Sequence, residues 1–558
     1  MAAEMTIFPS VPTSPAGAHK GNFFALREAG NGADELELRF GPEQTLIATL
    51  SPGPSPLGAD LEWLGDCALG ERYSLYAVCS GALVRPADGA AAPEVFIEDP
   101  SWHTMARDDR VAVVHTDGAG PSLLELDAAA VESIARSWAD GGAPIRPGAG
   151  GASEFGSVLH HARILHRVSM YGPEGILPNP WSTPCRTSEY QRPMIAMWDT
   201  LHIVLDLLAM GELELSAREL ANHYAQQDEQ SGQMPQDCVP SAPDAADAIA
   251  AGTRDAAGRK FDISQPPLWA RVTLEVADRL GSDAMLAELY PLVEANLGWW
   301  EANRLDAETG LFFWRNRNES GADNTPRFGG GGGGGGAEPP EDDSAGTEDT
   351  SDYGAADLTA QMHLSYEAAA EMARRTGRDP SRWEAEAEAS AGAMNGLLWS
   401  EEAGLYLDYD LTIEEQTGPR TPFGLFALLG SAPGEERAAR MVETLTDAAS
   451  FWRELPVPTV AVDEDSYSLD MWRGPVWLSL NLWIAKGLVR WGRKDLAAEL
   501  ARRGLRRAQS VLEREGCILE FYPADGMRTG SLRRKGDVAG AHRYYLGHAP
   551  LHALAELL

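Results

Sequence analysis

Residues 283–328 carry the sequence DAMLAELYPLVEANLGWWEANRLDAETGLFFWRNRNESGADNTPRF. The first half has apolar residues at helical spacing, which predicts a helix over 283–303. The second half is a loop crowded with charged and amide side chains, among them Glu319, Asp323, Asn324 and Arg327. A long helix that ends in such a loop indicates a helical scaffold with polar residues gathered at one end.

The same pattern of a helix followed by a polar loop recurs from about residue 154 onward. Helical segments alternate there with Pro/Gly-rich loops that hold most of the Trp, Asp and Arg residues. These segments are 155–167, 192–210, 214–228, 266–281, 283–303, 355–376, 380–398, 422–430, 434–449, 474–492, 494–514 and 543–557. About twelve antiparallel helices fit a toroid of six hairpins, in which inner helices surround an axis and the loops at one end form a pocket. The expected fold is mainly α, an (α/α)6 toroid.

The chain before this region has a strand pattern. Alternating apolar runs separated by Gly and Pro clusters are ELELRF at 35–40, YSLYAV at 73–78, VAVVHT at 111–116 and SLLEL at 122–126. A short helix is expected over 131–138, followed by a Gly-rich linker over 141–153. We therefore expect a smaller β-sandwich-like domain over 1–145 and the helical catalytic domain over 146–558.

A low-complexity insert interrupts the helical region at about 329–356. It begins with eight consecutive glycines and continues with a run of acids. A loop that cradles phosphate needs a preceding strand, a following helix and usually a lysine, and none is visible. The insert is expected to be a disordered loop.

Charge and composition exclude several classes of function. The chain has 83 acidic and 46 basic residues, a formal charge of −37, and only five lysines, so nucleic-acid binding is not expected. The acidic surface fits either a salt-adapted cytoplasm or a genome that favours these residues. No stretch predicts a membrane span or signal peptide, and five scattered cysteines predict neither disulfides nor a zinc site. We expect a cytoplasmic protein of undetermined oligomeric state.

Two acids stand out along the helical region. Asp323 lies in the polar loop, where the alternative is a hydrogen-bonded loop cap with Arg327 paired to Glu319. Glu520 lies in CILEFYPADG, residues 517–526, between aliphatic and aromatic residues. A carboxylate in an apolar run must be paired or functional, because burying it alone is costly.

A series of blocks in a fixed order carries a family resemblance. They are PWSTP at 180–184, MWDT at 197–200, QQDEQSGQMP at 226–235, SQPP at 264–267, ESGADNTPRF at 319–328, DLTAQM at 357–362, LYLDYD at 405–410, LPVPTV at 455–460, MWRGPVWLSLN at 471–481 and EFYPADG at 520–526. With these blocks the chain resembles glycoside hydrolase family 63 and its mannosylglycerate or glucosylglycerate hydrolase-like relatives, and more distantly the trehalases.

The resemblance implies an inverting α-glycosidase, with Asp323 as general acid and Glu520 as general base. Cleavage of an α-glycosidic bond needs a proton on the departing oxygen, and a second carboxylate must activate water on the opposite face. Such carboxylates lie about 6.5–9.5 Å apart. The acid must keep its proton near neutral pH, whereas the base must stay ionised.

The resemblance also implies the residues of the sugar-binding pocket. The expected substrate contacts are Trp198, Asp199, Gln265, Glu319, Arg327, Trp472, Arg473 and Trp477. Core packing is the alternative for the three tryptophans. Asp408 and Asp410 are expected to be structural, as capping or pairing residues near the pocket.

No metal or other cofactor is expected. His548 and His552 have the i, i+4 spacing of a helical metal pair, with Glu556 one turn further on. However, Pro550 fits only the first turn of a helix, and hydrolysis by two carboxylates needs no metal. Histidines buried in the core or the pocket wall are the favoured interpretation.

The substrate stays open between several classes. The leading expectation is a small α-glucoside or α-mannoside, with a glycerate-bearing compatible solute as one candidate, for which Arg327, Arg473 or Arg543 could bind the carboxylate. Alternatives are a trehalase-like or oligosaccharide α-glucosidase, and a degenerate carbohydrate-binding protein. Sugar epimerases share the fold, but they rely on histidines rather than on the two acids. Asn318, where relatives often have an aromatic residue, and the segment 542–552 depart from the family pattern.

Overall fold

The computed structural model describes most of the helical region and the strands that precede it. Described in full are 152–168, 170–171, 175–184, 194–240, 248–328, 348–515, 518–536 and 546–558, together with the strands before residue 128 and single residues at 246 and 541. The predicted helix over 131–138 and most of the predicted linker lie outside these residues.

The chain divides into two compact units. The first comprises Met1–Pro144 with Arg167–Ser169 and Cys185–Pro193, and the second comprises Ile145–His166, Met170–Pro184 and Met194–Leu558. The division near residue 145 arises because contacts are dense within each unit and sparse across that point.

The first unit is built from antiparallel strands. These are β1 (Met5–Pro9), β2 (Phe24–Glu28), β3 (Asp34–Arg39), β4 (Thr45–Ser51), β5 (Asp60–Trp63), β6 (Leu75–Cys79), β7 (Val95–Phe96), β8 (Trp102–Arg107), β9 (Arg110–Thr116) and β10 (Pro121–Asp127). Their sheets have the orders β2-β3-β4-β5, β1-β6-β7 and β10-β9-β8. The four predicted apolar runs fall on β3, β6, β9 and β10, and their period-two alternation is what a pleated sheet requires.

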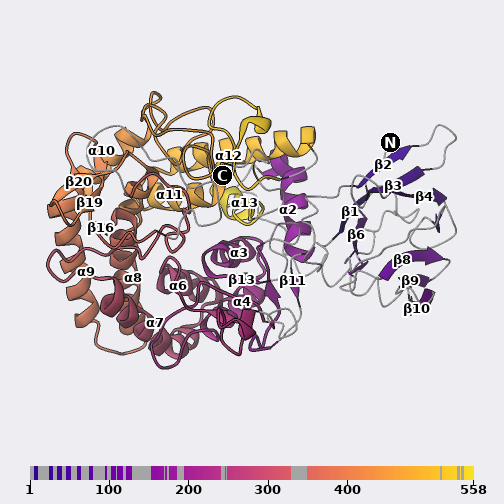
Figure 1. Ribbon diagram of the computed structural model, residues 1–558, viewed down its shortest axis with the longest axis horizontal. Coiled ribbons are helices and arrows are strands. Elements are labelled where there is room, and N and C mark those ends of the chain that lie inside the picture. Colours follow the sequence, from indigo (N-terminus) through magenta and orange to yellow (C-terminus); the bar gives the residue numbers. More distant parts are fainter. Residues whose placement is uncertain are drawn as a thin grey trace. The chain divides into compact units, whose positions relative to one another are not determined.

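The second unit contains a closed ring of inner helices. The ring elements are α3 (Met197–Ala209), α6 (Trp269–Leu280), α8 (Ala356–Arg375), the 3-10 helix η3 (Pro422–Leu429), α11 (Leu478–Arg490) and α13 (Leu551–Ala555). Each packs against the next, and α13 returns to α3 (Figure 1). The mainly α fold predicted from the helical pattern is confirmed.

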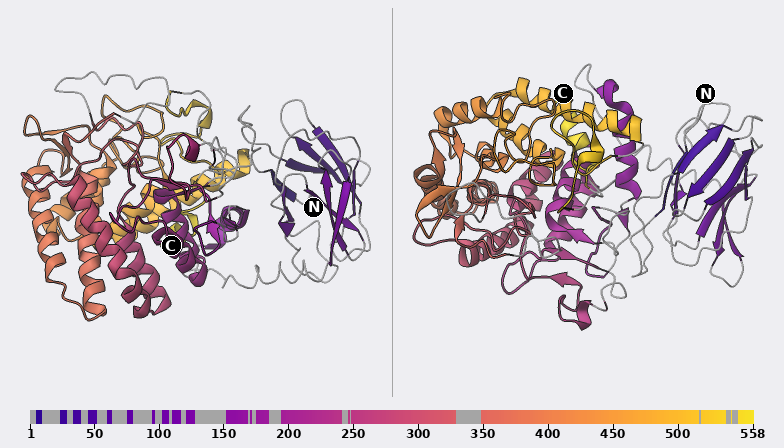
Figure 2. Two further views of the ribbon diagram at one scale, coloured as in Figure 1. Left: turned by 60° about the horizontal axis from the view of Figure 1, so that its bottom comes forward. Right: turned by 45° about the horizontal axis from the view of Figure 1, so that its top comes forward.

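Outer helices cover this ring. They are α4 (Leu213–Tyr224) on α3, α7 (Asp283–Arg304) on α6 and α8, α9 (Ser381–Ala393) on α8, α10 (Gly434–Leu445) on η3, and α12 (Lys494–Glu515) on α11. The long helices run side by side and the loops gather at one end (Figure 2). None of the described helices is long and apolar enough to cross a bilayer.

Sequence composition separates inner from outer helices. In α3 every residue except Asp199 is buried, so this helix is apolar nearly all round. The outer helix α10 buries only Ala438, Met441, Val442 and Leu445, which follow the spacing of a single apolar face. These two helices illustrate the difference between a ring helix buried on all sides and an outer helix that buries one face.

Three helices of the ring region meet at one buried carboxylate. Asp206 on α3 accepts hydrogen bonds from His166 of α2 (Gly156–Val168) at 2.7 Å and from His552 of α13 at 2.8 Å, and the Ala553 amide donates to its other oxygen at 2.8 Å. Although burial opposes the charge, the two histidines hold the pKa of Asp206 at about 2. The same three side chains have the residue types and spacing to hold a metal ion. One nitrogen of each histidine lies at hydrogen-bond distance from the carboxylate, so the cluster links α2, α3 and α13.

The structure corrects two expected boundaries. The predicted insert is shorter than 329–356, because residues 348–356 are ordered: Thr350 donates to the Trp314 carbonyl at 2.7 Å and a strand forms at Tyr353–Gly354. Residues 329–347 lie outside the described chain. The last helix spans Leu551–Ala555 rather than 543–557, since Pro550 allows a helix to begin but not to continue through it.

Glu219 on α4 anchors the PWSTP segment to the helices. It is fully buried and accepts a hydrogen bond from the Ser182 amide at 2.8 Å. Burial raises the pKa of Glu219 to about 8, because the surrounding protein solvates a charge poorly, and the Ser182 bond only partly opposes this.

Glu219→Gln is expected to raise the free energy of unfolding above pH 5. The unfolded carboxyl has a pKa near 4.5, whereas the folded one keeps its proton up to about pH 8. Between these values unfolding releases a proton, so wild-type stability falls by about 1.4 kcal/mol per pH unit as the pH rises. Glutamine does not titrate, so the variant lacks this fall in stability with rising pH. Urea unfolding of both proteins at pH 5, 7 and 9 measures the difference. Glu214→Gln, on the exposed face of the same helix, is the control. A gain in stability that is equal at every pH would contradict the prediction.

Candidate active site

The loop that carries ESGADN is fixed by Glu319. This carboxylate is fully buried and forms a bidentate ion pair with Arg304, with bonds of 2.8 and 2.7 Å. It also accepts the Ser264 amide at 2.9 Å and the Arg315 amide at 2.6 Å. These four donors occupy both oxygens from within the protein. The direct substrate contact expected for Glu319 is therefore replaced by an anchoring role for the loop.

Gly321 brings this loop against the predicted sugar-binding tryptophan. Its φ of +73° lies in the left-handed region, and a Cβ added there would lie 3.0 Å from Cδ1 of Trp198. Trp198 lies in the first turn of α3 and is 6% exposed, and its amide donates to Gln265 at 3.3 Å. Gln265 in turn donates to the Asn318 carbonyl at 3.3 Å. The ESG loop, α3 and the segment before α6 are thus locked together.

Gly321→Ala is expected to lower kcat/KM by about 10-fold or more while the fold remains. A methyl group meets both the left-handed backbone and the Trp198 ring, so the loop that carries Asp323 must shift. Steady-state kinetics with circular dichroism measures both effects. The control is Gly281→Ala, which is also left-handed but has open space around the added carbon. Equal losses of activity in the two variants would show that loss of left-handed backbone freedom, rather than the Trp198 contact, matters.

Arg327 lies deeper than the expected substrate contact requires. It is 1% exposed and forms bidentate ion pairs with Asp357, at 2.8 and 2.7 Å, and with Asp408, at 2.8 and 2.6 Å. Its guanidinium also lies 4.6 Å from the centroid of the Phe423 ring. The alternative pairing of Arg327 with Glu319 is wrong, because Glu319 takes Arg304 instead.

Asp408 and Asp410 behave as the sequence predicts. Besides Arg327, Asp408 accepts the Ala356 amide at 2.9 Å, at the N-terminus of α8. Asp410 caps a turn by accepting the amide and hydroxyl of Thr412 at 2.9 and 2.6 Å. Their structural role is confirmed.

The WRGPVW block forms a buried wall between the two acid-bearing segments. Its Trp472 amide donates to Asn324 at 2.9 Å, next to Asp323 in the chain. Trp472 and Trp477 stack with ring centroids 3.9 Å apart, and both are 3% exposed. Trp477 also contacts Phe521, the neighbour of Glu520. The packing alternative fits Trp477, because its indole N–H is used by the Met471 carbonyl at 3.0 Å.

Glu520 lies in a segment paired with this same block. The Val476 and Tyr522 backbones exchange two hydrogen bonds, of 2.7 and 2.9 Å, which fix the segment beside WRGPVW. Glu520 is 2% exposed, and Arg534 donates from Nε to its Oε2 at 3.3 Å. The buried acid predicted from the apolar run is thus paired with an arginine.

Asp323 faces a lysine. Lys535 Nζ lies 3.1 Å from Asp323 Oδ2, and the two side chains are 19% and 23% exposed. Arg534 and Lys535 are consecutive, so one dipeptide contacts both predicted catalytic carboxylates. Two acids nearly two hundred positions apart in the chain therefore converge on one short segment.

Two other predicted residues are partly exposed at the same end of the ring. Asp199 is in the first turn of α3, and Arg473 follows Trp472. The Arg473 side chain forms no hydrogen bond or ion pair with the part of the chain that the structure describes. Burial lowers its pKa, and Asp470 opposes this. Arg543 lies outside the described residues.

Sequence reasoning missed Arg534 and Lys535. A signal was available, because LRRKG at 532–536 is a basic run in a chain with a charge of −37 and five lysines. Glu556, one turn after His552, pairs with Arg279 at 2.6 Å.

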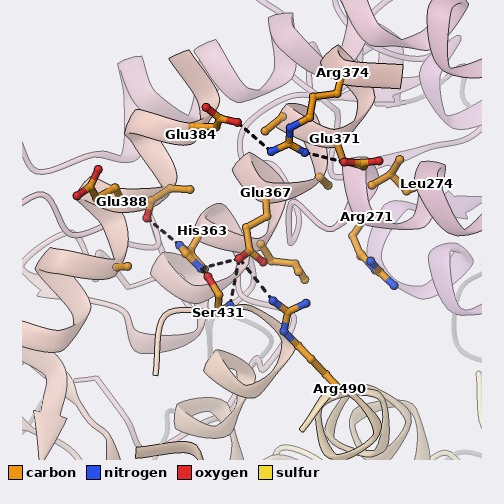
Figure 3. A pocket seen from close by; sticks show the side chains of 15 residues that line it. Arg271, Leu274, His363, Glu367, Glu371, Arg374, Glu384, Glu388, Ser431 and Arg490 are labelled. Atoms are coloured by element: carbon orange, nitrogen blue, oxygen red, sulfur yellow. Dashed lines mark hydrogen bonds and ion pairs between the residues drawn. The ribbon is translucent and has the colours of Figure 1, made fainter. Parts of the chain in front are cut away.

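A separate cavity of about 580 Å³ lies away from these residues, between α6, α8, α9 and the end of α11 (Figure 3). Its charges are largely matched among themselves. Glu367 contacts His363 at 3.5 Å and Arg490 at 3.6 Å, while Arg374 bridges Glu371 and Glu384 at 2.6 and 3.0 Å. None of the predicted site residues lines it.

Comparison with known proteins identifies the family. Residues 192–544, more than half of the chain, match the mannosylglycerate hydrolase MGH1-like glycoside hydrolase domain. The chain belongs to this family. The predicted resemblance is confirmed. The matched region begins just before α3 and includes every predicted site residue of the glycoside hydrolase domain.

Relatives of the chain include a mannosylglycerate hydrolase from Rubrobacter radiotolerans, 34% identical over 166 residues. The aligned stretch is 29% of this chain and 37% of that relative, so it spans about a third of the relative's length. A solved GH63 mannosylglycerate hydrolase from Thermus thermophilus, in complex with glucose, has a TM-score of 0.55 at 20% identity and covers 71% of this chain and 99% of its own. Neutral trehalase from Saccharomyces cerevisiae has a TM-score of 0.52 at 14% identity, covering 71% and 80%. These structures share the helical fold.

Proposed function

We propose that the protein is an inverting α-glycosidase that hydrolyses a small α-glucoside or α-mannoside. The helical unit is its (α/α)6 catalytic domain, and the first unit is an auxiliary β-sandwich. The enzyme acts in the cytoplasm without a metal or other cofactor. The observation that carries the proposal is the convergence of Asp323 and Glu520 on the Arg534–Lys535 dipeptide, within the family's domain.

The environments of the two acids support different roles. Glu520 is buried and contacts the guanidinium of Arg534, a position that suits the general base. Asp323 is 23% exposed in the loop, where an incoming glycosidic oxygen could approach it. Asp323 donates its proton to that oxygen as the bond to the anomeric carbon breaks. Glu520 accepts a proton from the water that attacks the opposite face, so the product is inverted.

The places of the surrounding residues around the two acids support a role for them in sugar binding. Trp198 and Asp199 lie in the first turn of α3, and Trp472 lines the wall between the acids, so these three are the proposed sugar contacts. Gln265, Glu319 and Arg327 act behind them, by holding the loop that presents Asp323. Substrate alignment of this kind contributes to rate because small displacements of an acid are costly.

The arginines of the site favour an aglycone that carries a carboxylate over a neutral sugar. Arg327 is saturated by two aspartates, so it is no longer a candidate to bind glycerate, whereas Arg473 has no partner among the described residues. The Thermus relative was solved in complex with Tris and D-glycerate. We therefore favour a glycerate-bearing α-glycoside. A trehalase-like activity is the second candidate, because a trehalase shares the fold.

A direct assay tests this proposal. The full chain is incubated with glucosylglycerate, mannosylglycerate, trehalose and short α-glucans, and NMR follows the anomer that appears first. Initial release of the β-sugar from an α-linked substrate is the expected result. Initial release of the α-sugar would overturn inversion, and no hydrolysis of any substrate would favour a carbohydrate-binding protein.

A further inference from the structure

The segment that contacts both proposed catalytic acids is held in place by its backbone. Arg533 donates to the Leu469 carbonyl at 2.8 Å and accepts from the Met471 amide at 3.0 Å. The Gly536 amide donates to Asp470 at 2.9 Å. These bonds fix residues 533–536 beside residues 469–471, which come directly before Trp472 in the chain. Lys535 has a φ of +51°, an uncommon backbone conformation for a lysine, and such conformations concentrate at functional sites.

The two consecutive cations meet acids with opposite requirements. A general base works as a carboxylate, so the Arg534 contact with Glu520 suits its proposed role. A general acid must present its proton to the glycosidic oxygen, yet here Asp323 Oδ2 lies 3.1 Å from the Lys535 ammonium, which occupies that oxygen. As it stands, the Lys535 contact opposes the chemistry that Asp323 is proposed to perform.

The position of the general acid indicates which group could draw the Lys535 ammonium away from Asp323. A general acid lies at the glycosidic oxygen, which joins the sugar to its aglycone, so a cation bound to the acid lies beside the aglycone. In a chain with a charge of −37, an anionic substrate needs a local positive group. Lys535 supplies one on a flexible stem, whereas Arg327 is fixed by two aspartates.

We propose that Lys535 makes the proton donor respond to the charge of the aglycone. In the substrate-free chain its ammonium group pairs with Asp323. An anionic group on the aglycone then takes over the ammonium, and Asp323 binds the proton that it donates. This inference rests on the proposed function, and it adds a reason why a neutral aglycone would be a poor substrate.

The proton balance of the step is complete. Asp323, once released, takes one proton from solvent and passes it to the departing glycosidic oxygen. The bond from the anomeric carbon to that oxygen breaks, and a bond to a water oxygen forms. Glu520 accepts a proton from this water and returns it to solvent. One water is consumed, and no oxidant or other reactant is needed.

A pair of substrates that differ only in charge tests the inference. Glucosylglycerate and glucosylglycerol carry the same sugar, with a carboxylate in one and a hydroxymethyl group in the other; the mannosyl pair is used if the enzyme prefers mannose. Lys535→Gln is expected to lower kcat/KM for the glycerate substrate by about 100-fold. It is expected to raise kcat for the glycerol substrate by about 3-fold or more, because no ammonium then competes with the glycosidic oxygen for Asp323.

Two further variants separate positioning from folding. Lys535→Arg keeps the charge and is expected to restore much of the preference for the glycerate substrate. Arg528→Gln removes an exposed charge from the same segment and is expected to change neither activity. Equal loss on both substrates in Lys535→Gln would mean that the lysine only supports the loop, which overturns the inference. Wild-type enzyme that cleaves both substrates equally well would also overturn it, while the glycosidase function stands. Wild-type enzyme inactive on every glycoside would instead reject the proposed function.

Discussion

Asp323→Asn and Glu520→Gln are each expected to lower kcat by about 10²–10⁴-fold with small changes in KM. Each substitution removes one proton transfer from the transition state and leaves the size of the side chain unchanged. Both residues lie in segments held by hydrogen bonds to the WRGPVW block, so the fold should survive. Steady-state kinetics on the substrate found by the NMR assay, with thermal unfolding as a check, measures the effect.

A substrate with an activated leaving group distinguishes the two roles. An α-glycosyl fluoride needs little protonation on departure, so it should restore much of the rate of Asp323→Asn. It should not restore Glu520→Gln, because attack by water still needs a base. Asp525→Asn is the control, since this exposed carboxylate pairs with Arg453 at 2.8 Å in the same segment as Glu520. Full activity in either catalytic variant, or rescue of both by the fluoride, would reject the assignment.

The number and spacing of the helical segments were sufficient to predict a mainly α fold, because each segment shows the apolar periodicity of a helix that packs against neighbours. The pattern also placed the polar loops correctly, since each follows or precedes a helix of the ring. Element ends were less predictable. Residues 394–398 form a π-helix after α9 where the sequence suggests continuous helix, because local composition does not specify that change in hydrogen bonding.

The roles of charged residues in the motif were harder to predict. Glu319 and Arg327 are as conspicuous in the sequence as Asp323, yet both are satisfied within the protein. Their partners decide this, and Asp408 is 81 positions from Arg327. Sequence distance of that size carries no information about which carboxylate meets which arginine. Lys535 was also hard to interpret. The sequence shows that it is one of only five lysines, but it does not show that this side chain contacts Asp323.

Arg327→Met is expected to lower the free energy of unfolding by at least about 3–5 kcal/mol, and we expect little folded protein at 37 °C. The substitution leaves Asp357 and Asp408 as buried carboxylates without their common cation. Although burial opposes its charge, these aspartates raise the pKa of Arg327, which shows how strongly the three charges are coupled. Urea unfolding and soluble yield measure the effect.

Arg374→Met provides the matched control, because Arg374 also bridges two carboxylates, Glu371 and Glu384, but lies at 48% exposure. Water can solvate the two carboxylates once the arginine is gone, so Arg374→Met should lower the free energy of unfolding by no more than about 1 kcal/mol. Adding Asp357→Asn and Asp408→Asn to Arg327→Met should recover part of the stability, since the uncompensated charges are then removed. Arg327→Lys should recover less, because one ammonium cannot form the two bidentate pairs. A loss in Arg327→Met as small as in Arg374→Met would mean that water reaches the aspartates. The charge network around Arg327 would then contribute little to holding the loop that presents Asp323, which the Glu319–Arg304 ion pair also anchors.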